Sequence, residues 1–99
     1  MAPRSLDAIV TIPEDVIFRE LEGEAVILNL TTGVYFGLNE VGTRAWMKLA
    51  ESRSVRMVVV ALAEEYDVDR ATLEQDVLGL LADLIDKGLV IVDARETSS

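Results

Sequence analysis

The sequence predicts an α+β fold, a three-stranded antiparallel sheet followed by three helices that pack on one face of it. Three observations lead to this prediction. Apolar runs with a period of two come first, runs with a helical period come last, and no strands and helices alternate. At 99 residues and 51% hydrophobic, the chain suits a single domain with its own core.

The first part of the chain predicts a three-stranded meander. Val16–Leu21 and residues 25–31 are rich in β-branched and apolar residues, and the short Glu22-Gly23-Glu24 turn between them predicts a hairpin. Thr32-Gly33 then forms a two-residue reversal in which glycine can take a positive φ. Residues 34–37 are therefore expected to pair with the second strand as the last strand of the sheet.

A helix is predicted directly after the third strand. Asn39 is placed to cap its N-terminus, and Val41, Ala45 and Leu49 repeat at i, i+4 and i+8 as an inward stripe. Trp46 adjoins this stripe, and we expect it to anchor the core rather than to form a binding surface.

Two further helices complete the predicted fold. Ser54 caps the second, although a buried strand over residues 55–63 is the competing interpretation because three consecutive valines lower helix propensity. Asp69 caps the third, which ends near residue 87 before Gly88, a left-handed stop. Residues 89–92 either add to the sheet or lie across the core.

The domain organisation is expected to be simple. Residues 1–11 are predicted to be a flexible N-terminal arm, residues 12–93 one folded domain, and residues 94–99 a flexible tail. The longest uninterrupted apolar run, residues 57–63, is far shorter than the ~20 residues of a membrane span. We therefore expect a soluble, cytoplasmic protein without a membrane partner.

The composition excludes several classes of function. The chain has no Cys and no His, which rules out disulfides, Cys/His zinc sites and nucleophiles activated by imidazole. With 18 acidic and 9 basic residues, the net charge of −9 repels nucleic-acid phosphates and favours cationic peptides or basic partner faces. No catalytic residues, metal ligands or cofactors are expected.

From about residue 13 to residue 92, the chain resembles a known family. The matching stretches are Leu30-Thr31-Thr32-Gly33-Val34-Tyr35-Phe36-Gly37-Leu38-Asn39, Gly42, Trp46, Leu62, Glu65-Tyr66-Asp67-Val68, Asp76-Val77, Leu84 and Lys87-Gly88-Leu89. This pattern is similar to that of the PqqD family, the small winged-helix-like domains also called RiPP recognition elements. The resemblance implies a protein that binds the leader of a ribosomally made precursor peptide and presents it to modifying enzymes.

The resemblance also implies a binding site. Family members take up the leader as an additional antiparallel strand on the edge of the third strand, with apolar side chains entering the cleft beside the third helix. By matching position, the peptide-binding residues are Val34, Tyr35, Phe36, Gly37, Asp76, Leu80, Asp83, Leu84 and Lys87. Alternation allows only one pair of strand residues, 34 with 36 or 35 with 37, to face the cleft, and the sequence leaves both open.

The predicted function is therefore that of a stand-alone peptide chaperone in a lasso-peptide pathway. Its expected partners are the leader peptide and a leader peptidase, a cyclase or a radical SAM enzyme, and a homodimer is left open. The alternative is a role in pyrroloquinoline quinone biosynthesis with a radical SAM enzyme. A winged-helix DNA-binding regulator is disfavoured because residues 69–87 carry five acidic and two basic residues, a net charge of −3. A small enzyme is disfavoured because no convergent set of polar residues is evident.

Overall fold

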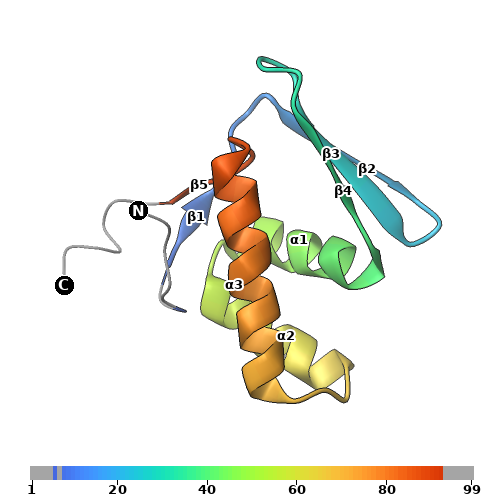
Figure 1. Ribbon diagram of the computed structural model, residues 1–99, viewed down its shortest axis with the longest axis vertical. Helices are drawn as coiled ribbons and strands as arrows, with labels where there is room; N and C mark the ends of the chain where they lie inside the picture. The colour runs from blue at the N-terminus through green and yellow to red at the C-terminus, as the bar shows by residue number, and fades with distance from the viewer. Residues whose placement is uncertain (1–5, 7, 93–99) are drawn as a thin grey trace.

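The computed structural model describes residue 6 and residues 8–92, which form the predicted α+β fold. Three antiparallel strands, β2 (Val16–Leu21), β3 (Glu24–Asn29) and β4 (Tyr35–Leu38), form a sheet in the order β2-β3-β4. Helices α1 (Glu40–Ser52), α2 (Val55–Glu65) and α3 (Arg70–Asp86) follow, and all three lie on one side of the sheet (Figure 1). The described part of the chain contains no helix both long and apolar enough to cross a membrane.

Strand β3 is shorter than the sequence predicts. It ends at Asn29 instead of continuing to Thr31, and the residues from Leu30 to Gly33 form a four-residue turn. The Asn29 side-chain oxygen accepts hydrogen bonds from the N–H groups of Thr31 at 2.9 Å and Thr32 at 3.1 Å. An Asn side chain that bonds the backbone two residues on replaces the strand ladder with a turn, which explains the early end.

The helix boundaries agree with the predicted caps. The side chains of Asn39, Ser54 and Asp69 each accept a hydrogen bond from a backbone N–H in the first turn of α1, α2 and α3. Residues 55–65 are helical, so the competing strand interpretation is wrong. Gly88 follows α3 with φ +72°, the left-handed conformation expected there.

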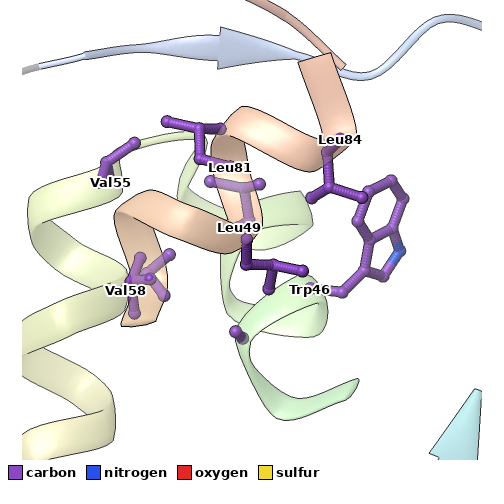
Figure 2. A pocket seen from close by; sticks show the side chains of 9 residues that line it. Trp46, Leu49, Val55, Val58, Leu81 and Leu84 are labelled. Atoms are coloured by element: carbon purple, nitrogen blue, oxygen red, sulfur yellow. The ribbon is translucent and has the colours of Figure 1, made fainter. Parts of the chain in front are cut away.

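The core lies between the three helices and the inner face of the sheet. Trp46 is only 3% exposed, which confirms its predicted role as a core anchor. In Figure 2 its ring lies beside Leu84 of α3, while Leu49 lies near Leu81. The cavity lined by these residues is about 10 Å³, room for one water molecule at most, so it is not a ligand pocket.

The N-terminal segment differs from its prediction from residue 8 onward. Ala8 and Val10 are both fully buried, and β1 (Val10–Thr11) pairs antiparallel with β5 (Ile91–Val92). The prediction of a flexible arm over residues 1–11 is therefore wrong for residues 8–11, because their apolar side chains complete the core. Residues 1–5, 7 and 93–99, which include the predicted tail, lie outside the described residues.

Candidate functional site

Strand β4 lies at an edge of the three-stranded sheet. Sequence analysis left open whether residues 89–92 add to this sheet. In the structure, Ile91 and Val92 pair with β1 in a separate two-stranded sheet. Within the described residues, the outer side of β4 thus has no strand partner, and an edge of this kind can accept another chain.

The backbone groups available on this edge belong to alternate residues. The Asn29 N–H donates to the Val34 carbonyl at 2.9 Å, which makes these two residues a hydrogen-bonded pair of the antiparallel ladder. Because the pattern repeats every second residue, the N–H and C=O groups of Phe36 also face β3. Those of Tyr35 and Gly37 point to the open side. Two residues therefore offer two donors and two acceptors to an added strand.

Side chains of β4 also alternate between two sides of the sheet. Phe36 pairs with the fully buried Ile27 and is itself half-buried on the side of the helices. Tyr35 is 71% exposed and lies on the opposite face. Of the two pairs that the sequence left open, Val34 with Phe36 is therefore the one on the helical side.

An apolar groove opens where β4 ends and the helices begin. Its volume is about 330 Å³, and it is lined by Asn39, Val41, Gly42, Ala45, Leu62, Leu73, Asp76, Val77 and Leu80. Asn39 directly follows β4, and the last four residues belong to α3. The groove thus begins directly after β4, and its mostly apolar wall includes one carboxylate, that of Asp76.

Helix α3 brings most of its predicted site residues to one surface. Asp76, Asp83 and Lys87 are spaced by seven and four residues, which places them on one helix face, and all three are exposed. Leu80 is half-buried between them and lines the groove together with Asp76. Leu84, in contrast, is 1% exposed and packs in the core, where it supports this wall without offering a surface to a ligand.

Strand β4 and helix α3, the two walls of the candidate site, approach each other near the C-terminal end of α3. The Lys87 ammonium nitrogen lies 5.8 Å from the centre of the Phe36 ring, within the range of a cation–π interaction. At the same end, the Asn29 side chain donates a hydrogen bond to the Gly88 carbonyl at 3.0 Å. Strand β4 and helix α3 thus face each other with the groove at one end and these contacts at the other.

Sequence reasoning missed several residues of this region. Val41 was assigned to the inward stripe of α1, yet it is 40% exposed and lines the groove with Leu62 and Leu73. A helical period identifies which apolar residues share one face of a helix, but not which of them are buried in the core. Asn29 carried no local signal for its contact with Gly88, because the two residues are 59 positions apart.

The most perturbed ionisable groups lie elsewhere, between α1 and α2. Glu65 forms ion pairs with Lys48 and Arg44, both at 2.9 Å. Hydrogen bonds from Lys48 and Arg44 hold the pKa of Glu65 below its usual value, and Glu65 in turn raises the pKa of Arg44. Within the described residues, no group of three acidic, His or Cys side chains is arranged to hold a metal ion.

A family model matches residues 24–90, a range that contains β3, β4, all three helices and the groove. Its description is coenzyme PQQ synthesis protein D (PqqD). The chain belongs to the PqqD family. This confirms the resemblance and covers the region that carries the open edge.

Two relatives of this PqqD-family chain are proteins of Rhodopseudomonas palustris named PqqA binding protein. That of strain TIE-1 is 45% identical over 47 residues, which are 48% of this chain and 45% of the relative. That of strain BisB5 is 43% identical over 47 residues, again 48% of this chain and 45% of the relative. The PqqD-family chain thus spans less than half the length of these relatives.

Two solved structures match the PqqD-family chain over most of its length. TbiB1, in complex with the TbiA(beta) leader peptide, is 38% identical with a TM-score of 0.75, over 85% of this chain and 95% of that one. A lasso peptide synthetase B1 complexed with the leader peptide is 24% identical with a TM-score of 0.74, over 85% and 99%. The second likeness supports the fold alone.

Proposed function

We propose that this PqqD-family protein binds the leader of a ribosomally synthesised precursor peptide as a strand added to β4, and presents it to a separate modifying enzyme or leader peptidase. The observation that carries the proposal is the open edge of β4 beside α3 and the apolar groove. Backbone hydrogen bonds would supply affinity that depends little on the sequence of the peptide, while the groove would discriminate between its side chains.

The proposed contacts are divided between the two walls. Tyr35 and Gly37 offer backbone groups, and Val34 and Phe36 lie on the side of the helices, where alternate side chains of an added strand also point. On α3 and at its C-terminal cap, the proposed contacts are Asp76, Leu80, Asp83 and Lys87, with Leu84 supporting them from the core. The acidic pair would attract cationic residues of the peptide and orient it electrostatically.

A lasso-peptide pathway is the preferred context. TbiB1 matches 85% of this chain at 38% identity, and its structure contains a leader peptide. The competing candidate is a PqqA-type precursor in pyrroloquinoline quinone biosynthesis, which the names of the Rhodopseudomonas relatives favour over a shorter stretch. The protein is proposed to act in the cytoplasm without catalytic activity, with a leader peptidase, cyclase or radical SAM enzyme as its partner.

Fluorescence polarisation tests the proposal directly. Labelled TbiA(beta) leader peptide and labelled Rhodopseudomonas palustris PqqA are titrated separately with the protein, and tighter binding of the first favours the lasso context. Leu80→Asp and Phe36→Asp should weaken binding while circular dichroism stays close to that of the wild type. Met57→Asp is the matched control, because Met57 is 54% exposed on α2 and outside the groove. Unchanged affinity in both cleft variants would refute the placement of the site.

Two additional measurements test the alternative functions, a small enzyme and a DNA-binding regulator. Incubation with precursor peptide alone should leave the mass of the peptide unchanged, and a new product would indicate an enzyme. A gel shift at low salt should show no DNA binding, because the charge of α3 opposes contact with phosphates. A shifted band would favour the regulator instead.

A further inference from the structure

Asn29 makes an unusual set of contacts at the end of β3. It is 7% exposed, and its side chain makes three hydrogen bonds, two within the β3–β4 turn and one to Gly88, just after α3. Its backbone N–H and C=O bond to Val34 and Gly33. The turn that leads into β4 is therefore built around this one residue.

The chemistry of the three partners restricts what can stand at this position. The backbone N–H groups of Thr31 and Thr32 require an acceptor, whereas the Gly88 carbonyl requires a donor. A short side-chain amide supplies both, which also fixes which side of the amide carries the oxygen. A carboxylate of the same shape satisfies only the turn and places an oxygen against the Gly88 carbonyl.

The Gly88 carbonyl is itself held firmly. The Gly88 N–H donates to the Ile85 carbonyl at 3.0 Å, and the Leu89 N–H donates to the Leu84 carbonyl at 2.9 Å. The following residues, Leu89 and Val90, are almost fully buried. The hydrogen bond from Asn29 thus joins the turn before β4 to a rigid end of α3.

The Asn29 bond lies between the turn that precedes β4 and the end of α3. Asn39, which follows β4 and caps α1, lines the groove together with residues of α3. At the other end of β4, Asn29 connects the preceding turn to the residue that follows α3. A hydrogen bond within the protein itself therefore joins the turn before β4 to the end of α3, and it needs no peptide to form.

We propose that Asn29 is a positioning residue for the peptide site, one that holds β4 and the C-terminal end of α3 at the separation an added strand requires. This inference rests on the proposed function. A site formed in advance avoids the loss of affinity that follows when only a fraction of molecules is competent to bind. Loss of the bond would lower that fraction without removing any group that touches the peptide.

The test uses Asn29→Asp, which keeps the shape and the turn contacts but removes the donor to Gly88. Its dissociation constant for labelled TbiA(beta) leader peptide should rise about fivefold to tenfold, the effect of losing one buried hydrogen bond. Val59→Ala is the control, because Val59 is fully buried on α2 and lies outside the groove. It should lower the melting temperature and leave peptide affinity within about twofold, as expected for a purely structural residue.

A second measurement reports the separation of the walls without peptide. The chain has no Cys, so Leu30→Cys and Asp86→Cys allow two spin labels to be attached at exposed positions on the turn and on α3. Pulsed electron paramagnetic resonance should give a narrow distance distribution for the otherwise wild-type protein and a broader one with Asn29→Asp. Saturating peptide should narrow the second distribution again.

The outcomes are distinct. Equal affinity of Asn29→Asp and the wild type, an unchanged distance distribution, or an equal loss of affinity in Val59→Ala would each overturn the proposal. Failure of the wild type to bind any leader peptide would instead refute the proposed function, and the distance measurement would still decide whether Asn29 holds the walls. If Asn29→Asp does not fold, Asn29→Ser keeps an acceptor for the turn but is too short to reach Gly88, and the same criteria apply.

Discussion

The two edge strands of the sheet, β2 and β4, expose the same kind of backbone groups but carry different side chains. Strand β2 has six residues and includes Arg19 and Glu20, both exposed. Strand β4 has four residues, Tyr35 to Leu38, none of them charged. Charged side chains on an edge discourage pairing with other chains, so β2 is protected in a way that β4 is not.

The surroundings of β4 add a second difference. Lys87 at the end of α3 contacts the Phe36 ring, and the groove that begins at Asn39, directly after β4, is lined by Asp76 and Leu80. An added strand on β4 would therefore meet a helical wall as well as backbone groups. An open edge flanked by a second element can therefore select an added strand by its side chains as well as by its backbone.

The largest expected effect on peptide binding comes from removing one outward N–H of β4. Gly37→Pro removes an N–H that faces the open side of β4, and a Cβ at this position meets no atom within 4 Å. Loss of this hydrogen bond should weaken leader-peptide binding about 10-fold to 100-fold by fluorescence polarisation. A proline is tolerated on an edge strand when its missing N–H would face solvent.

Glu20→Pro is the matched variant on β2. Arg19 pairs with Val26, whose N–H and C=O face β2, so the backbone groups of Glu20 point away from the sheet. This variant should leave peptide affinity within about twofold. An equal loss of affinity in both variants would show that the peptide does not distinguish the two edges.

A smaller effect on peptide binding is expected from a substitution in the groove. Val41→Ser removes part of an exposed apolar side chain that lines it, and should weaken peptide binding about threefold to tenfold, the effect of about 1 kcal/mol of lost burial. Met57→Ser, a change at an exposed apolar residue of α2, is the control and should have no effect. Equal dissociation constants for wild type and Val41→Ser would show that the groove is not part of the peptide-binding site at β4.

The smallest effect is expected at the ion pairs of Glu65, between α1 and α2. Because Lys48 and Arg44 lower its pKa in the folded protein, ionised Glu65 adds stability above its unfolded pKa, and this contribution disappears as the pH falls through the lowered folded value. Glu65→Gln should therefore reduce the melting temperature slightly at pH 7 but not in acid, with peptide binding unchanged. A difference in melting temperature that persists at low pH would contradict the assigned ion pairs.

Local patterns predicted the elements well because each depends on near neighbours. The caps at Asn39, Ser54 and Asp69 need only the next helical turn, and the stop at Gly88 needs only a residue that accepts a positive φ. The same local reasoning failed for β3, where the Asn29 side chain ended the strand early. At that position, the hydrogen bonds of one polar side chain formed a turn, although the apolar residues alternate as in a strand.

For the candidate site, the sequence located the edge strand and the helix that faces it, but not which side chains are accessible. Leu84 and Leu80 belong to the same apolar stripe of α3, yet one is buried beside Trp46 and the other lines the groove. Val41 was likewise assigned to the core and lies in the groove wall. Exposure within a stripe depends on the neighbouring elements, which periodicity does not describe.

The sequence by itself determined the order of strands and helices and the family, because these follow from periodicity, capping and motif spacing along the chain. Only the tertiary structure decided that β5 pairs with β1, that Phe36 lies on the helical side, and that Asn29 contacts Gly88 across 59 residues. Those features depend on contacts between segments distant in sequence. Their geometry is set when the core packs, and no local pattern encodes it.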